Sequence, residues 1–254
     1  MLLAVDAGNT QITMGLYDGA RLVQDFRVES SIGRTTDEYH VLFLNLLEIA
    51  EVERSAVQSS ILASVVPPLT DRILDAVDGA FDHEMMVVGP GIKTGMPILY
   101  ENPAEVGADR IANAVAAFAR VQDAVIVVDF GTGTNFDCIS AKGEYMGGAI
   151  APGIEIAANA LFSRAARLRP ANLERPPKAI ARNTTHAVQS GIVFGYAGLV
   201  DGLVDRLRAE IGGNCAVLGT GGLASLVAPE SRTLQEVDEF LTLEGLRLLY
   251  ERNR

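Results

Sequence analysis

The fold is decided by two similar stretches of sequence, LLAVDAGNT at residues 2–10 and VIVVDFGTGT at residues 125–134. Each is an apolar run that ends in an aspartate, Asp6 or Asp129, followed after one residue by glycine and then by small, mostly hydroxyl or amide residues. A carboxylate at a strand end can hold a cation, and the glycine lets backbone N–H groups approach an anion closely. Asp129 follows Asp6 by 123 residues, about half the chain. The pair therefore predicts a duplicated domain that grips one polyphosphate from both sides.

The repeat extends beyond these two turns. For the first half we expect strands at 2–7, 11–17, 21–28 and 60–66, and helices at 37–51 and 103–121. For the second half we expect strands at 124–129, 134–140, 145–150 and 215–219, and helices at 153–168 and 239–252. A β-meander that alternates with strand–helix units predicts an α/β protein with a mixed sheet flanked by helices in each half. This pattern resembles the fold of acetate kinase, sugar kinases, the Hsp70 ATPase domain and actin, and implies two ribonuclease H-like domains, 1–122 and 123–254.

The composition limits the class of protein further. The 254 residues are 48% hydrophobic, carry a net charge of −11 and include three lysines, none of which follows a Gly-x-x-x-x-Gly motif. A Walker-type P-loop is thereby excluded, and the charge argues against a nucleic-acid surface. No apolar run reaches the roughly 18 residues of a membrane helix, and the start lacks the basic flank of a signal peptide. Cys138 and Cys215 lie in apolar runs and are expected to be reduced core residues. We expect a cytoplasmic protein.

A long helix is predicted at 186–211, with a stripe of glycines on it: Gly191, Gly195, Gly198 and Gly202. Small residues at helical spacing let another helix approach closely. Two interpretations stay open, a helix crossing inside the chain and a homodimer interface, since surplus apolar helix surface needs a partner. A membrane role is not expected, because the helix carries charged residues toward its end, among them Asp201 and Asp205.

The next candidate for chemistry is the segment EVGADR at residues 105–110, which opens a strongly apolar helix. The carboxylate of Asp109 could accept a proton from a substrate hydroxyl, a role that typically contributes 10²–10⁴-fold to the rate. The guanidinium of Arg110 could bind a carboxylate or a transferring phosphoryl group in bidentate fashion. Taken alone, such a dipeptide is more often a surface ion pair at a helix start.

Several motifs occur in the order found in type III pantothenate kinases. They are residues 6–10 (DAGNT), 107–110 (GADR), 129–134 (DFGTGT), 147–153 (GGAIAPG), 182–184 (RNT), 189–191 (QSG), 221–222 (GG) and 241–246 (LTLEGL). The chain thus resembles this family over nearly its whole length. The resemblance implies ATP-dependent phosphorylation of pantothenate, the first step of coenzyme A biosynthesis, with ATP held between the two Asp-x-Gly loops.

The resemblance also implies a role for individual positions. Asp109 matches the catalytic base. The ATP and phosphate positions are Asp6, Gly8, Asn9, Thr10, Thr132, Gly221 and Gly222. The pantothenate positions are Tyr100, Gly107, Arg110 and Thr184, of which Thr184 matches a residue that reaches the site of a neighbouring subunit. Asp6 would serve Mg²⁺, directly or through water, and Asp129 a monovalent cation, K⁺ or NH₄⁺. The implied assembly is a homodimer with the active site near the subunit interface.

One departure from the family pattern lies in the second loop. The loop usually reads Gly-Thr-Ala-Thr-Thr, whereas here it is GTGTN at residues 131–135. Gly133 adds backbone freedom that costs about 0.5–1 kcal/mol relative to alanine in an ordinary strand. We expect this change to affect ATP affinity and cation preference and not the reaction class. Two other functions share the motifs in part: a non-catalytic regulator on the same scaffold, and a different small-molecule kinase or polyphosphate phosphatase of the superfamily.

Overall fold

The computed structural model describes residues 1–165, 168–213 and 215–254. By their internal contacts these residues form two compact units. Unit 1 consists of Met1–Gly95, Glu101–Ala116 and Leu241–Arg254, and unit 2 of Met96–Tyr100 and Ala117–Phe240. The chain passes between the units within helix α3 (Ala108–Val121). Each unit is built around one sheet of five strands.

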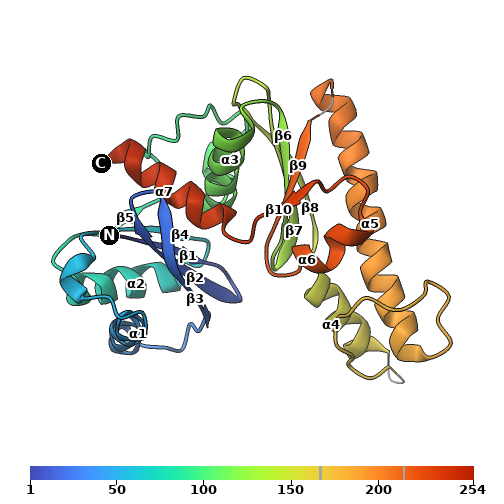
Figure 1. The fold of residues 1–254 in the computed structure, drawn as a ribbon, viewed down its shortest axis with the longest axis horizontal. Helices are drawn as coiled ribbons and strands as arrows, with labels where there is room; N and C mark the ends of the chain where they lie inside the picture. The colour runs from blue at the N-terminus through green and yellow to red at the C-terminus, as the bar shows by residue number, and fades with distance from the viewer. Residues whose placement is uncertain (166–167, 214) are drawn as a thin grey trace. The chain divides into compact units, whose positions relative to one another are not determined.

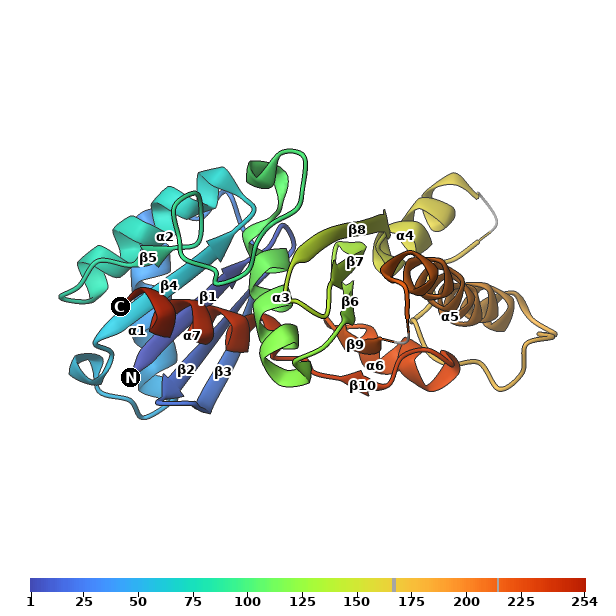
Figure 2. The same ribbon diagram turned by 90° about the horizontal axis from the view of Figure 1, so that it is seen from above.

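Unit 1 contains the sheet β3-β2-β1-β4-β5. Its strands are β1 (Leu2–Ala7), β2 (Gln11–Asp18), β3 (Arg21–Glu29), β4 (Ser59–Ser64) and β5 (Met86–Val87), and its other elements are α1 (Thr36–Ile49), α2 (Pro67–Ala80), the 3₁₀ turns η1 (Arg54–Ala56) and η2 (Pro103–Glu105), and α7 (Leu241–Asn253). The three strands of the meander pair antiparallel, and β1, β4 and β5 pair parallel. Helices α1 and α2 cover one face of the sheet and α7 the other (Figure 1). Figure 2 shows α7 laid across β1, β2 and β4, against which it packs.

Unit 2 contains the sheet β10-β9-β6-β7-β8. Its strands are β6 (Val125–Phe130), β7 (Gly133–Ile139), β8 (Tyr145–Pro152), β9 (Ala216–Thr220) and β10 (Glu236–Val237), and its other elements are α4 (Ile154–Arg164), α5 (Thr184–Ile211), α6 (Ala224–Val227) and η3 (Ala228–Glu230). The strand order and directions repeat those of unit 1, with β6 in the place of β1 and β9 in the place of β4. Side chains of α4, α5 and α6 join those of the sheet in one apolar core. Both cysteines are buried and unbridged, as expected.

The predicted class, two mixed sheets flanked by helices, is confirmed. The eight predicted strands are present, with ends that differ by a residue or two. The helix expected at 103–121 begins at Ala108, because Pro103–Glu105 forms a separate 3₁₀ turn. The helix expected at 153–168 is α4, which ends at Arg164; residues 166 and 167 lie outside the described part. Helix α2 was missed, since its first residues, Pro67 and Pro68, resemble a loop in the sequence.

The compact units differ from the expected division into 1–122 and 123–254 in three places: Met96–Tyr100 belongs to unit 2, unit 2 resumes at Ala117 instead of residue 123, and the C-terminal helix belongs to unit 1. Helix α7 follows β10 of unit 2 along the chain but belongs to unit 1 by its contacts. Its leucines Leu241, Leu243, Leu246 and Leu249 are almost completely buried there, and Gly245 lets α7 approach the backbone of Ala112 in α3. Leu243 lies over Gly15 of β2, where an added Cβ would stand 2.9 Å from its Cδ1.

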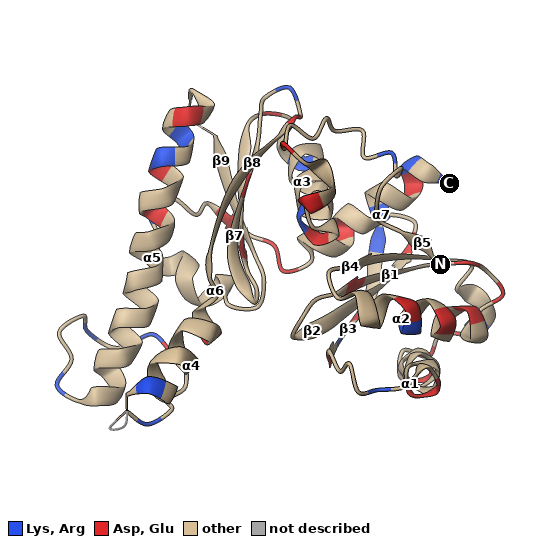
Figure 3. Ribbon diagram, turned by 180° about the vertical axis from the view of Figure 1, so that it is seen from behind, with Lys and Arg blue, Asp and Glu red and all other residues tan. Residues whose placement is uncertain are grey.

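The glycine stripe of α5 lies on an uncovered side of the helix. A Cβ built on Gly191, Gly195 or Gly198 would meet no described atom within 4 Å, so of the two interpretations left open, no helix crossing inside the described chain occupies these positions. Figure 3 shows that charged residues of α5 gather toward its C-terminal end, and residues 184–200 contain none. By length and composition alone α5 could cross a membrane. One such helix is weak evidence, because the core helix of a soluble protein passes the same test.

Candidate active site

The first predicted phosphate loop follows β1 in unit 1. Within β1, Asp6 is the residue that keeps partial exposure while its neighbours are buried. The N–H of Gly8 donates to the backbone carbonyl three residues later at 3.0 Å, which closes a tight turn. The hydroxyl of Ser30, just after β3, donates to the carbonyl of Gly8 at 2.6 Å and holds the turn from the side. Asn9 and Thr10 are exposed at its tip. The loop therefore presents a carboxylate, an amide and a hydroxyl at the C-terminal end of β1, the central strand of the sheet.

The second group of predicted residues in unit 1 lies at the start of α3. The carbonyl of Gly107 accepts the first helical hydrogen bond of α3. A Cβ on Gly107 would stand 2.4 Å from Oδ1 of Asp109 and 3.4 Å from Val65, so a side chain here would displace the carboxylate. The N–H of Val65 donates to the carbonyl of Ala7 at 3.2 Å. Because Ala7 follows Asp6, one chain of contacts connects the Asp6 loop with the segment that carries Asp109.

The electrostatics of Asp109 set it apart from an ordinary surface carboxylate. Burial raises the pKa of Asp109, although the backbone N–H and the positive charge of Arg110 act in the opposite direction. Oδ1 of Asp109 accepts the N–H of Arg110 at 2.8 Å. The Arg110 side chain is itself buried, with 7% of the residue exposed. Arg110 is buried and Asp109 is half-buried, so a freely exposed ion pair at a helix start does not describe these residues. A carboxylate with a raised pKa is suited to accept a proton.

In unit 2 the second predicted loop follows β6. Asp129 pairs with Thr220 of β9, which places Gly221 beside it. Gly221 has φ +89°, and a Cβ built on it would stand 2.7 Å from both Oδ1 of Asp129 and the carbonyl oxygen of Phe130. Two oxygen donors thus line a space that a side chain would fill, and such donors suit hard cations. A Cβ on Gly222 would meet no described atom within 4 Å, so this glycine borders open space.

The rest of this loop is held by the end of β8. The N–H of Gly153 donates to the carbonyl of Thr132 at 3.1 Å, and a Cβ on Gly153 would stand 2.1 Å from that oxygen. Thr132 itself is exposed. At Gly133, where the chain departs from the family pattern, a Cβ would have ordinary contacts, the nearest 3.4 Å away at Asn135. Gly133 is therefore not required by packing.

Tyr100 belongs to a short segment that is docked on β8 of unit 2. The N–H of Leu99 donates to the carbonyl of Tyr145, and the N–H of Tyr145 to the carbonyl of Pro97, both at 2.8 Å. The rings of Tyr100 and Tyr145 lie 6.4 Å apart, and the hydroxyl of Tyr145 donates to the buried carboxylate of Asp137 at 2.7 Å. These contacts fix the backbone that carries Tyr100.

Thr184 lies elsewhere in unit 2, at the first turn of α5. The side chain of Asn183 caps the helix by accepting the N–H of His186 at 2.8 Å. Thr184 is exposed and lines a pocket of about 200 Å³ together with Arg169, Thr185 and Val188. Within unit 2 the structure brings together Asp129 and Gly221, and it places Thr184 on a separate helix. Asp6, Gly107, Asp109 and Arg110 belong to unit 1.

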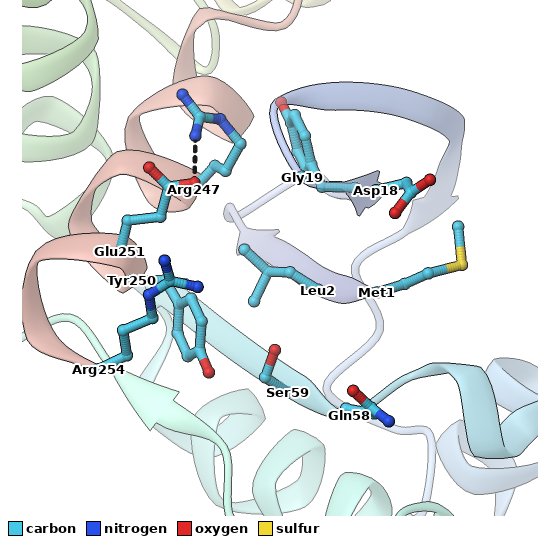
Figure 4. A pocket seen from close by; sticks show the side chains of 11 residues that line it. Met1, Leu2, Asp18, Gly19, Gln58, Ser59, Arg247, Tyr250, Glu251 and Arg254 are labelled. Carbon is cyan, nitrogen blue, oxygen red and sulfur yellow. Dashed lines mark ion pairs between the residues drawn. The ribbon is translucent and has the colours of Figure 1, made fainter.

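A further pocket of about 320 Å³ lies in unit 1, at the opposite end of β1 from Asp6 (Figure 4). It is lined by Met1, Leu2, Tyr17, Asp18, Gly19, Gln58, Ser59, Arg247, Tyr250, Glu251 and Arg254. Arg247 forms ion pairs with Glu244 and Glu251, at 2.7 and 2.6 Å, so its charge is already matched. This pocket contains none of the residues that the sequence singles out.

Sequence reasoning missed four residues that hold the predicted ones in place. They are Ser30, Val65, Tyr145 and Asp137. Ser30, Val65 and Tyr145 act through contacts with segments far away in the chain, and Asp137 acts through Tyr145 on the next strand. No local pattern marks these contacts. Gly153 lies within a quoted motif, but its contact with Thr132 could not be read from that motif. Among the described residues there is no group of three His, Cys, Asp or Glu side chains that could hold a metal ion.

The two mixed sheets flanked by helices have the fold found in sugar kinases. Over 98% of this chain and 97% of the other, it superimposes on the ROK hexokinase from Thermus thermophilus with a TM-score of 0.52 at 15% identity. A protein from Campylobacter jejuni described as belonging to the Baf family of transcriptional activators gives a TM-score of 0.63 at 20% identity, over 99% of this chain and 98% of the other. At these identities both likenesses concern the fold alone.

The family model of type III pantothenate kinase matches residues 2–206. The type III pantothenate kinase of Geobacter sulfurreducens is 54% identical over 254 residues, all of both chains. That of Syntrophus aciditrophicus is 51% identical over 253 residues, again covering both chains completely. The chain belongs to the type III pantothenate kinase family, whose members transfer phosphate to an alcohol group.

Proposed function

We propose that this protein transfers the γ-phosphoryl group of ATP to the primary hydroxyl of pantothenate, the first step of coenzyme A biosynthesis, in the cytoplasm. The observation that carries the mechanism is the half-buried carboxylate of Asp109, which lies against Gly107 at the start of α3 and whose pKa burial raises. Membership in the family, at more than half identity over the full length with several relatives, supports the substrate.

In this mechanism Asp109 is the general base. It accepts the proton of the pantothenate hydroxyl while the hydroxyl oxygen forms a bond to the γ-phosphorus, and the bond from that phosphorus to the β–γ bridging oxygen breaks to release ADP. The raised pKa of Asp109 brings it nearer to the operating pH and so favours proton transfer. Arg110 supplies a permanent positive charge for the pantothenate carboxylate or for the charge on the phosphoryl group. Tyr100, Gly107 and Thr184 complete the proposed pantothenate site.

The loop residues hold the nucleotide in this proposal. Asp6, Gly8, Asn9 and Thr10 would bind the terminal phosphates from one side and Thr132 from the other, and Gly221 and Gly222 would leave room for the adenosine. The open space beside Gly222 supports the last assignment. A divalent metal bound with the nucleotide, Mg²⁺, neutralises phosphate charge in such reactions. Asp6 would hold it, directly or through water, because Mg²⁺ usually takes one or two carboxylates and keeps several waters.

The proposed site for K⁺ or NH₄⁺ is Asp129. Its carboxylate and the carbonyl of Phe130 both border the space that the absent side chain of Gly221 leaves. A cation there would stabilise the second loop next to Thr132. The scarcity of lysine in the chain, three residues in all, fits a site that meets phosphate charge with bound cations and arginine.

The proposed assembly is a homodimer through α5. The support is the uncovered stripe of Gly191, Gly195 and Gly198, which would let the α5 helix of a second copy approach closely. Thr184 lies on the same helix, and in this proposal it reaches the pantothenate site of the partner. The active site would then be near the subunit interface.

The experiment that tests the proposal is a measurement of ADP release with MgATP and KCl. Pantothenate is compared with a panel of sugars and hydroxy acids, with a reaction lacking any acceptor, and with the Asp109→Asn variant. Release that requires pantothenate and is lost in the variant supports substrate and base together. Release with a panel compound in place of pantothenate would identify another small-molecule kinase. No release by a protein that binds ATP would support a non-catalytic regulator.

A further inference from the structure

The motif at residues 241–246 has no part in the chemistry proposed above. It opens α7, the C-terminal helix that packs on β1, β2 and β4 of unit 1. The apolar residues of the motif account for the attachment of α7 to the sheet. Two other residues of the motif, Thr242 and Gly245, contact α3 instead.

The first contact is a hydrogen bond between side chains. The hydroxyl of Thr242 donates to Oδ1 of Asn113 at 2.7 Å, and Asn113 is completely buried. Asn113 follows Asp109 by four residues on α3, so the two side chains lie on the same side of that helix, one turn apart. The hydrogen bond therefore holds α3 one helical turn away from the proposed base.

The second contact joins the backbones of the two helices. A Cβ on Gly245 would stand 1.9 Å from the carbonyl oxygen of Ala112 and 2.4 Å from its carbonyl carbon. Only glycine allows α7 and α3 to approach this closely, because a backbone atom cannot turn aside as a side chain can. Together with the bond to Asn113, the contact fixes two consecutive residues of α3 against α7.

We infer that α7 positions the proposed catalytic base, with Thr242 and Asn113 as positioning residues. Helix α7 packs on β1, which ends at the Asp6 loop, and on α3, which begins at Asp109. It therefore determines how the carboxylate of Asp109 is placed relative to that loop. This inference rests on the proposed function, in which Asp109 is the base and the Asp6 loop holds the terminal phosphates. Neither positioning residue contacts a substrate in this account.

The test compares Thr242→Val with Thr242→Ser. Valine has nearly the shape of threonine but cannot donate the hydrogen bond, whereas serine keeps the hydroxyl. We expect Thr242→Val to lower kcat about 10- to 100-fold, in the range that a misplacement of about 1 Å can cause. The KM values for pantothenate and MgATP should change less than about threefold, which corresponds to less than about 0.7 kcal/mol in binding. Thr242→Ser should restore kcat.

The control for a loss of stability alone is Val77→Ala. Val77 is completely buried in α2, in the core on the other face of the same sheet. It should lower the thermal unfolding midpoint and leave kcat unchanged. If Thr242→Val does not fold, Thr242→Ala removes the same hydroxyl and carries the same expectation.

Wild-type kcat in a folded Thr242 variant without the hydroxyl would overturn the inference, and so would an equal loss of kcat in Val77→Ala. Failure of the proposed function would look different. In that case Asp109→Asn would keep normal turnover, or neither the wild type nor any variant would phosphorylate pantothenate.

Discussion

Replacing Asp109 with asparagine should separate activity from stability in this protein. The side chains are nearly equal in size, and the amide oxygen of asparagine can still accept the N–H of Arg110, which Oδ1 accepts at 2.8 Å in the wild type. The start of α3 should therefore be kept. What the variant loses is the negative charge and the ability to take up a proton.

The substitution should lower the turnover rate without lowering the free energy of unfolding. Loss of a general base costs about 10²- to 10⁴-fold in rate, or about 2.7–5.5 kcal/mol of transition-state stabilisation. Stability should not fall, because burial raises the pKa of Asp109 and the ionised carboxylate is thus disfavoured in the folded state. Above the folded-state pKa this cost is fully present; below the unfolded-state value, near 4 for Asp, both states are protonated and the cost disappears.

The assay is turnover at pH 7 together with thermal unfolding at pH 7 and at about pH 4, near the ordinary pKa of aspartate. We expect kcat to fall at least a hundredfold, and the unfolding midpoint at pH 7 to stay equal or rise relative to the wild type. The difference in midpoint should shrink at the lower pH. Near-normal turnover would refute the role of Asp109 as the base. A lower midpoint at pH 7 would refute the argument from burial.

Three further predictions concern the cations, the second loop and the dimer. Replacing K⁺ with Na⁺ should lower kcat, and Asp129→Asn should abolish the difference between the salts; equal wild-type rates in both salts would discard the cation site. Gly133→Ala should stabilise the fold by about 0.4–1 kcal/mol in a denaturant titration, because alanine fits there without strain. In the control Gly148→Ala the added Cβ would stand 1.6 Å from the carbonyl oxygen of Phe136, so this variant should be destabilised by about 1–3 kcal/mol. Gly195→Arg should convert the proposed dimer to a monomer in light scattering and lower kcat with it; a dimer that persists would place the interface elsewhere.

The strands around the two loops could be predicted from the sequence because each loop marks its own strand ends. An apolar run that stops at an aspartate and a glycine fixes where β1 and β6 end, to within one residue. Helix α2 has no such signal at its start, and it was not predicted. Its two starting prolines occupy positions that need no backbone donor, so they suit a helix start as well as a loop.

The placement of α7 could not be predicted from the order of elements along the chain. Its apolar side would suit either sheet, and the sequence does not say which of the two it covers. The close approach that selects unit 1 depends on Gly245 and Ala112, which are far apart in the sequence and share no pattern. The contacts of Ser30 and Val65 could not be predicted either, because their partners also lie far away in the sequence.

The glycines of the candidate site have two different physical causes, and the sequence does not distinguish them. At Gly153 and Gly221 a Cβ would stand within 2.7 Å of a backbone oxygen, so glycine is required by the fold before any ligand binds. At Gly107 the close atom is the side-chain Oδ1 of Asp109, so glycine there leaves that carboxylate in its place. At Gly222 a Cβ would enter open space, and there glycine needs an explanation from outside the described residues. The ligand-facing part of the site is therefore smaller than its glycine-rich appearance suggests. In the proposed site, Gly153 and Gly221 would therefore act on a ligand only indirectly, because Gly153 lies against the carbonyl of Thr132 and Gly221 against the carboxylate of Asp129.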